Sequence, residues 1–335
     1  MFKRGFATDV QVDTILNINI TDKRAFKLLI DPKVFSIWPE PNFPKSSVFR
    51  PFRKTSRDIE DIFDGYYPNV FSVLFPSARA GLSAILSAHL SRNNYVWIPP
   101  FASHCIISSV GMVATPTPVM NSQVDATLVF HQWGYVHKPK MRGLIIEDSV
   151  DTLIEPKGQV FPNNGRYELL SLPKVFGSMF GGLVLCQNRE DAVSLRLIRE
   201  ERTVLKWQHL LNKLRSNRSQ ACFINWNNAD AENGFLPTIV CEDIYRKIKY
   251  LDDMVTFRKT MLEKVKNFGF KTYGDISETR LPTSLALDAN KIEIHGINLM
   301  PYERHFSIGQ DFKSMRKVLP IGLHKDISLK MINTL

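Results

Sequence analysis

The sequence lacks several features that would place it outside the ordinary globular proteins. It contains no apolar run of about 18 residues, so no membrane-spanning helix is expected. Its start, "MFKRGFATDVQVDT", has no apolar core of the kind found in secretory signals. Its four cysteines, Cys105, Cys186, Cys222 and Cys241, form no CxxC pair, which argues against a zinc site and a disulfide scaffold. We therefore expect a cytoplasmic protein with reduced thiols and no bound metal.

The net charge of +10 is compatible with an anionic partner. No zinc knuckle, helix-turn-helix signature or RNP-like aromatic strand is visible, so neither a nucleic acid nor a membrane is the expected partner. The basic stretch "KSSVFRPFRKTSR" (residues 45–57) has two interpretations. It is either a solvated, loop-rich segment or a surface that attracts a phosphorylated substrate.

Residues 70–187 alternate short apolar segments with helix-like ones. The helical pattern of "ARAGLSAILSAHLS" (78–91) places Leu82, Ile85, Leu86 and Leu90 on one face, and 104–113 resembles a second helix. Strands are predicted at 69–75, 95–100, 126–133, 143–149, 167–172 and 181–187. Nearly continuous apolar strands joined through helices predict an α/β fold with a parallel sheet covered on both faces.

After residue 188 the pattern changes to long charged helices. We expect helical segments at 190–215 and 242–269, and a last helix at 326–335. Strands are expected at 283–289 and 305–308. The predicted division is a large domain at 1–235, including an N-terminal extension, and a smaller C-terminal domain at 236–335.

The segment "LSLPKVFGSMFGG" (170–182) places one lysine, Lys174, between apolar residues and a glycine-rich turn. A surface lysine does not need such surroundings. A lysine whose pKa must be lowered, so that its amine attacks a carbonyl group, does.

Three further features follow predicted strands, where open α/β sheets gather their ligands. The turn "PSARAG" (76–81) leads into a helix and is either an ordinary turn or a phosphate site that includes Arg79. His104 follows "WIPPFAS" and is either structural or functional. Glu147 and Asp148 end an apolar strand, where Asp148 either caps a helix or pairs with a protonated group.

Together these features resemble the fold-type-I pyridoxal-phosphate (PLP) enzymes, and within them the DegT/DnrJ/EryC1/StrS family of sugar aminotransferases. The resemblance covers residues 70–188 and reappears weakly at "LPIGLHKDIS" (319–328). "FHQWG" (130–134) is similar to the family's His-x-aromatic-Gly strand end, and "IIEDSVD" (145–151) to its EDxAQ stretch. "SLPKVFGSMFGG" (171–182) is similar to its lysine segment. The implied fold is a three-layer, mainly parallel sheet with a smaller C-terminal α+β domain.

The resemblance also implies a role for individual residues. Lys174 would form the Schiff base with PLP, and Asp148 would keep the cofactor's ring nitrogen protonated. His104 would stack on the ring, and Asp151 would face its phenolic oxygen. The phosphate would rest on Ala78, Arg79, Ala80 and Ser171.

Two of these residues depart from the family pattern. A small hydroxyl residue is usual at the position of Arg79, and Gln or His at that of Asp151. A non-catalytic relative, acting as a binding or regulatory module, therefore stays open as an alternative. Relatives that dehydrate sugars carry a histidine in place of the lysine, so Lys174 argues against that reaction.

The resemblance implies transamination from glutamate to a nucleotide-linked keto-sugar, for surface polysaccharides or secondary metabolites such as antibiotics. It also implies a homodimer with shared active sites. Enzymes of this fold that act on dicarboxylates bind a carboxylate through an arginine. Arg246 and Arg258 are expected to be solvated on a charged helix, whereas Arg280 and Arg304 adjoin strands and could reach the cleft.

Overall fold

The computed structural model describes residues 38–39, 54–100, 102–202, 231–234, 236–267, 276–288, 293–294, 297–298, 304–308 and 314–324. Its helices are α3 (Ser56–Tyr66), α4 (Ala78–His89), α5 (His104–Gly111), the 3₁₀ turn η2 (Gln132–Gly134), α6 (Leu172–Phe176), α7 (Arg189–Glu201), α10 (Thr238–Ile248) and α11 (Leu251–Asn267). Its strands in the first half are β1 (Phe71–Phe75), β2 (Tyr95–Trp97), β3 (Thr115–Thr117), β4 (Val124–Phe130), β5 (Leu144–Asp148), β6 (Thr152–Ile154), β7 (Tyr167–Ser171) and β8 (Gly182–Cys186). The later strands are β9 (Arg280–Pro282), β10 (Ser284–Asp288), β11 (Glu293–Ile294), β12 (Ile297–Asn298), β13 (Arg304–Ile308) and β14 (Ser314–Gly322).

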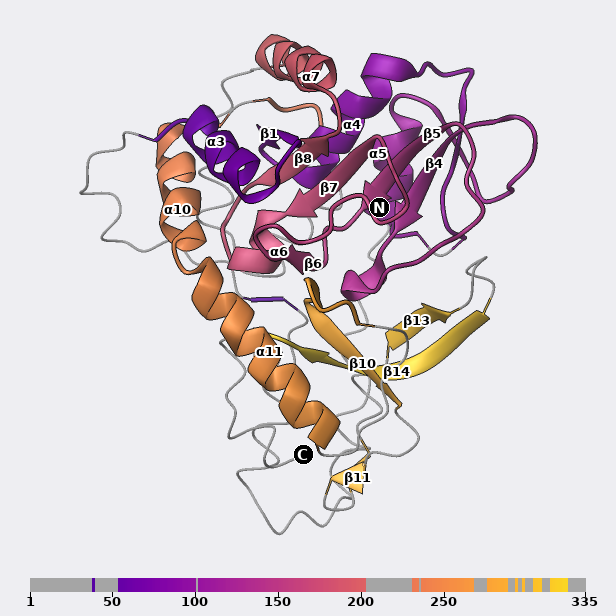
Figure 1. Ribbon diagram of the computed structural model, residues 1–335. Helices are drawn as coiled ribbons and strands as arrows, with labels where there is room; N and C mark the ends of the chain where they lie inside the picture. Colours follow the sequence, from indigo (N-terminus) through magenta and orange to yellow (C-terminus); the bar gives the residue numbers. More distant parts are fainter. Residues whose placement is uncertain are drawn as a thin grey trace, which may run out of the picture.

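The central feature is a seven-stranded sheet in the order β1-β8-β7-β5-β4-β2-β3 (Figure 1). Neighbouring strands from β7 through β5, β4 and β2 to β3 pair in parallel. β8 is antiparallel to both β1 and β7, so β1 runs in the same direction as β7. The predicted strands between residues 69 and 187 are therefore confirmed, and so is a mainly parallel sheet.

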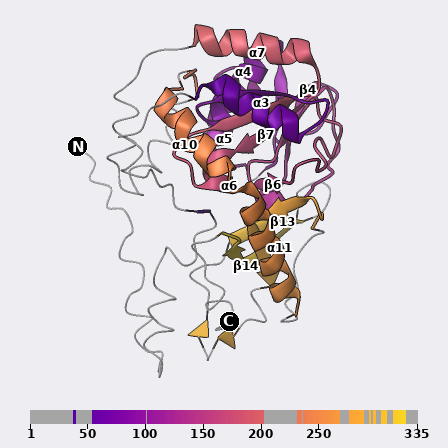
Figure 2. The same cartoon turned by 60° about the vertical axis from the view of Figure 1, so that its left-hand side comes forward.

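Both faces of this sheet are covered, because its buried side chains alternate between two separate hydrophobic clusters. Leu74 of β1 and Leu170 of β7 belong to one cluster, and their neighbours Val73 and Leu169 belong to the other. The first cluster includes residues of α3 and α10, and the second includes residues of α4, α5 and α7. The architecture is therefore the expected three-layer arrangement, with helices on either side of the sheet (Figures 1 and 2).

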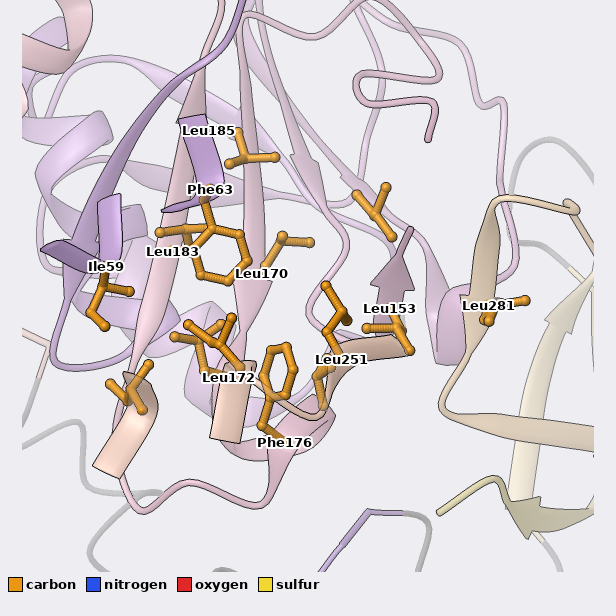
Figure 3. Packing of buried hydrophobic residues seen from close by; sticks show 14 of the residues in the cluster. Ile59, Phe63, Leu153, Leu170, Leu172, Phe176, Leu183, Leu185, Leu251 and Leu281 are labelled. Atoms are coloured by element: carbon orange, nitrogen blue, oxygen red, sulfur yellow. The ribbon is translucent and has the colours of Figure 1, made fainter. Parts of the chain in front are cut away.

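Helix α3 was not predicted; it begins at Ser56, inside the basic stretch for which a solvated loop and a surface attracting a phosphorylated substrate both stayed open. Thr55 caps this helix by accepting a hydrogen bond from the Asp58 N–H, and Asp58 bonds back to the Thr55 N–H. Ile59 and Phe63 then point into the first cluster, toward Leu183 and Leu170 of the sheet (Figure 3). This part of the basic stretch is therefore ordered by a capping box and by core packing.

The C-terminal part carries a second, antiparallel sheet in the order β10-β14-β13, which lies below the large sheet in Figure 1. The helical stretch expected at 242–269 consists of two helices, since α10 ends at Ile248 and α11 starts at Leu251. The first hydrophobic cluster includes residues from both sides of residue 235, among them Leu170, Ile244 and Leu281. The domain boundary at 235/236 stays a prediction. The expected helix at 326–335 lies outside the described residues, as do residues 203–230.

No helix in the described part of the chain is both long enough and apolar enough to cross a bilayer.

Candidate active site

The candidate active site lies at one edge of the large sheet, where β1, β4, β5 and β7 end and β8 begins. Gly182, the first residue of β8, is paired with Phe75 on one side and with Ser171 on the other. Asp148, the last residue of β5, is paired with Phe130 of β4 and Leu169 of β7. The register therefore brings the segments that follow these strands to one edge, as expected for ligand sites of parallel sheets.

The turn after β1 leads directly into α4, whose N-terminus faces this edge. Ser77 is the N-cap and its hydroxyl accepts a hydrogen bond from the Ala80 N–H. Gly182 is so close to this turn that a Cβ atom there would lie 2.1 Å from the backbone nitrogen of Ala78. Ala78, Arg79 and Ala80 thus form the first turn of a helix held against β8. Such a terminus, with its positive dipole end and a basic side chain, favours an anion.

Lys174 lies on α6, a short helix that follows β7 without a linker. Pro173 stands at the helix start, where its missing N–H is harmless, and Gly177 ends the helix in the left-handed conformation with φ 65°. Lys247 of α10 donates a hydrogen bond of 2.8 Å to the Gly177 carbonyl. The helix that carries Lys174 is therefore fixed at both ends. Ser171, which precedes it, is buried and its hydroxyl does not cap the helix.

The Lys174 amine contacts two side chains that come from elsewhere in the chain. Its Nζ lies 3.0 Å from Oδ1 of Asp151 and 4.4 Å from the centroid of the Trp38 ring. The Trp38 indole N–H donates to the same Asp151 oxygen over 2.7 Å. A carboxylate and an aromatic face both stabilise a cation. The surroundings of the amine are therefore not purely apolar, in contrast to the sequence expectation.

Asp148 is the second carboxylate of the site and is 5 % exposed. Burial raises its pKa to about 6, while the charge of Lys174 opposes this rise and that of Asp151 adds to it. Its Oδ1 accepts a hydrogen bond of 3.2 Å from the Val150 N–H. Asp148 is thus a buried acid that interacts electrostatically with Lys174 and gains from any additional positive charge placed beside it.

Glu147 and His131 form a buried hydrogen-bond network next to Asp148. His131 donates from Nε2 to Glu147 over 2.8 Å, and its Nδ1 accepts from the His137 backbone N–H. Glu147 also accepts hydrogen bonds from the backbone N–H groups of Asn163 and Gly165. Burial lowers the pKa of His131 to about 3, so the ring stays neutral. This network fixes the turn that follows β4.

Two arginines beyond residue 235 are buried next to the site. Arg280 donates to Oε1 of Glu168 over 2.7 Å and to the Ser149 hydroxyl over 2.8 Å, so its guanidinium is already engaged. The expectation that Arg258 is solvated was wrong, since this residue is 1 % exposed. It donates to the carbonyls of Pro282 and Val175 at 3.3 and 3.5 Å. Burial lowers its pKa to about 9.

The sequence offered a signal for the burial of Arg258 but none for Trp38. Arg258 is four residues after Met254 and three before the buried Met261, which places it on the apolar face of α11. Trp38 precedes β1 by more than thirty residues and belongs to no motif near the other site residues.

His104 is the first residue of α5 and is exposed. No contact of His104 with Lys174 or Asp148 is recorded among the described residues, so its stacking role stays a prediction. Within the described ranges, no group of three His, Cys, Asp or Glu side chains is arranged to hold a metal ion.

The residues at this edge fit PLP. The amine of Lys174 suits an aldehyde, the buried Asp148 suits a protonated ring nitrogen, and the start of α4 with Arg79 suits a phosphate. Asp151 stands where the resembled family usually has Gln or His. It differs chemically from both, since a carboxylate accepts hydrogen bonds but does not donate them.

Comparison with known proteins agrees with PLP as the cofactor. Residues 59–288 match the model of a family described as "Putative PLP-dependent aminotransferase". No curated protein sequence matches the chain.

Solved structures share the fold at low sequence identity. The apo form of "Putative sugar aminotransferase Spr1654" from Streptococcus pneumoniae is similar with a TM-score of 0.61 and 11% identity, over 88% of this chain and 94% of that one. Its PLP form gives a TM-score of 0.56 at 13% identity, with 94% of each chain covered. DesV of S. venezuelae has a TM-score of 0.51 and 14% identity, over 85% and 88% of the two chains. DesI, solved in the presence of its TDP-sugar product, has a TM-score of 0.50 and 12% identity, over 80% and 70%.

The family match covers residues 59–288, which is more than half of the chain. The protein therefore belongs to a family of PLP-dependent aminotransferases.

Proposed function

We propose that this protein transfers an amino group from glutamate to a keto-sugar linked to a nucleotide. One observation carries the proposal: Lys174 lies 3.0 Å from Asp151 and interacts electrostatically with the buried Asp148 at the same sheet edge. A lysine with two carboxylates around it provides a nucleophile, a site for a protonated ring nitrogen and a group that orients the amine.

Lys174 is the residue that binds the cofactor covalently and moves the proton. When bound, PLP supplies an aldehyde and an electron sink for the reacting carbon. The Nζ atom of Lys174 takes a proton from the substrate carbon as general base and returns it as general acid. The fixed ends of α6 hold the backbone of Lys174, and the contact with Asp151 orients its amine, as orientation-dependent proton transfer requires.

Asp148 holds a proton at the ring nitrogen of the cofactor. Its pKa of about 6 leaves the carboxyl mostly ionised at neutral pH, and a neighbouring pyridinium charge stabilises the ionised form further. The first turn of α4, with Ala78, Arg79 and Ala80, together with Ser171, binds the phosphate. In the PLP-bound protein, His104 would pack against the ring and Asp151 would face the phenolic oxygen.

Two features support a nucleotide-linked keto-sugar over a dicarboxylic acid as acceptor. Arg280 is paired with Glu168 at 2.7 Å and both are fully buried, so this arginine does not bind a substrate carboxylate. The net charge of +10 attracts a diphosphate. Spr1654, described as a sugar aminotransferase, and DesI, solved in the presence of its TDP-sugar product, agree with this substrate class.

We further propose a homodimer with shared active sites that acts in the cytoplasm in polysaccharide or secondary-metabolite synthesis. Each subunit would have a large domain at 1–235 and a smaller one at 236–335. Exposed Ile107 on α5 is a candidate for the subunit interface. Light scattering at micromolar protein tests the dimer, and a strictly monomeric active enzyme contradicts it.

The substrate class is tested by following the two half-reactions separately by absorbance. Glutamate should convert the PLP form of the protein to the amine form, with release of 2-oxoglutarate. A nucleotide-linked keto-sugar such as TDP-4-keto-6-deoxyglucose should then restore the PLP form. Failure of every nucleotide-linked keto-sugar, together with turnover of a free aldehyde or another keto acid, would overturn the proposed acceptor.

A further inference from the structure

Trp38 reaches the site from a part of the chain that lies far from it in sequence. In Figure 1 the Trp38–Pro39 segment lies below α6, apart from the rest of the indigo part of the chain. The indole N–H donates to Asp151, 113 positions later, over 2.7 Å. The residue as a whole is 37% exposed. One edge of the indole is therefore anchored, while part of its surface stays accessible.

The distance between the indole and the lysine decides which part of a substrate the ring can touch. Nζ of Lys174 lies over the ring, 4.4 Å from its centroid. A reacting carbon must come within roughly 3–3.5 Å of the group that attacks it. The atoms bonded to that carbon therefore reach the indole. In a nucleotide-linked keto-sugar these atoms belong to the sugar ring, because the diphosphate separates the nucleotide from it.

We propose that Trp38, anchored by Asp151, forms a wall of the acceptor subsite and packs on the C–H face of the keto-sugar ring. This inference rests on the proposed function. A large, flat indole contributes much contact area at a small cost in side-chain entropy. A sugar ring presents a flat C–H face that matches it, whereas glutamate has no ring. Trp38 therefore favours the acceptor, and Asp151 is its positioning residue.

Binding to a catalytically inactive protein tests the proposal without turnover. The PLP-loaded protein is reduced with borohydride, and its affinity for TDP-glucose and for TDP alone is measured by calorimetry. Replacement of the indole in Trp38→Ala should weaken TDP-glucose binding about tenfold and change TDP binding less than twofold. Tyr95→Ala is the matched control, since Tyr95 is 40% exposed and lies at the start of β2, away from the site.

The half-reactions give a second measurement. Trp38→Ala should slow the reaction with TDP-4-keto-6-deoxyglucose about tenfold at low concentrations of the sugar, and the glutamate half-reaction less than twofold. Equal losses in both half-reactions, or equal weakening of TDP-glucose and TDP, would overturn the inference alone. A wild-type protein that binds neither compound and converts no keto-sugar would overturn the proposed substrate class, and the inference with it.

The anchor is tested by a double-mutant cycle. Trp38→Phe and Asp151→Ala remove the two ends of one hydrogen bond, so each should weaken TDP-glucose binding to the reduced protein several-fold. The double variant should be no weaker than the weaker single variant, because the same contact is lost only once. Additive losses would show that Asp151 does not act through Trp38.

Discussion

A Cβ atom added to Gly182 would lie 2.1 Å from the backbone nitrogen of Ala78 and 2.1 Å from the backbone carbonyl carbon of Ser77. Rotation of a neighbouring side chain cannot relieve this contact, because the atoms that the Cβ would meet belong to the backbone. Glycine is therefore required where β8 starts beside the turn that opens α4. The position of this turn decides where the N–H groups of α4 point, so Gly182 connects the sheet to the proposed phosphate site.

We expect Gly182→Ala to weaken PLP binding at least tenfold, because the first turn of α4 must move away from the sheet edge. Cofactor affinity is measured by absorbance titration of the apo protein. Gly111→Ala is the matched control: a Cβ there meets nothing within 4 Å, and the change replaces a helical glycine. It should keep the affinity and add a few tenths to about 1 kcal/mol of stability. Unchanged affinity in Gly182→Ala contradicts the proposed phosphate site.

Asp148→Asn should stabilise the cofactor-free protein while it weakens the cofactor complex. Burial raises the pKa of Asp148 from 3.8 to about 6, so the folded state holds this proton more tightly than the unfolded chain. Ionisation of Asp148 in the folded protein therefore lowers the free energy of unfolding by roughly 3 kcal/mol. The full loss applies above about pH 6, and there is no loss below about pH 4. The asparagine oxygen can still accept the Val150 N–H.

Urea denaturation of the two proteins at pH 7.5 and pH 4.5, with and without PLP, measures both effects. The variant should be more stable at pH 7.5 without PLP, with a smaller difference at pH 4.5. PLP should stabilise the wild type much more than the variant. Equal stabilisation of the two proteins by PLP would mean that Asp148 has no contact with the ring nitrogen.

Glu168 and Arg280 join β7 to β9 through a fully buried ion pair of 2.7 Å. Removing one partner leaves the other charge buried, so Glu168→Gln and Arg280→Met should each lower the free energy of unfolding by about 3–5 kcal/mol. The double variant should lose less than the sum of the single losses. Chemical denaturation measures the cycle, and additive losses contradict a direct pairing.

Acid should destabilise the fold through two buried histidines. Burial lowers the pKa of His131 to about 3 and that of His137 to about 4, whereas unfolded histidine titrates near 6.5. Below pH 6.5 the unfolded chain therefore binds more protons, and the free energy of unfolding falls by roughly 2 kcal/mol per histidine at pH 5. His137→Asn keeps the backbone N–H that bonds to His131 and should flatten this dependence. An unchanged slope would contradict the assignment.

The elements of the large sheet could be predicted from the sequence because each one buries a continuous apolar segment. Phe71–Phe75, Tyr167–Ser171 and Gly182–Cys186 are buried almost throughout, and turn residues bound them. The strand β6, by contrast, is three residues long and pairs with β9, 126 or more positions later. Short strands paired over such separations leave no local pattern, so they could not be predicted.

The positions of two candidate residues could be predicted because apolar strands mark them: Asp148 ends β5, and Lys174 lies just after β7. The place of Trp38 in the site could not be predicted, because it depends on a hydrogen bond to Asp151, which lies 113 positions later. The charge on the α11 helix suggested a solvated Arg258, but its position beside Met254 and Met261 decides its burial. The division of the helix at Lys249 and Tyr250 also escaped prediction, since no glycine or proline marks it.

The central claim is that Lys174 carries the cofactor. The most direct test is to incubate the protein with PLP, reduce it with borohydride and map the modified peptide by mass spectrometry. The account predicts a single reduced adduct on Lys174 and its loss in Lys174→Ala, with the fold retained by circular dichroism. An adduct on any other lysine, or the absence of a specific adduct in a folded protein, would contradict it.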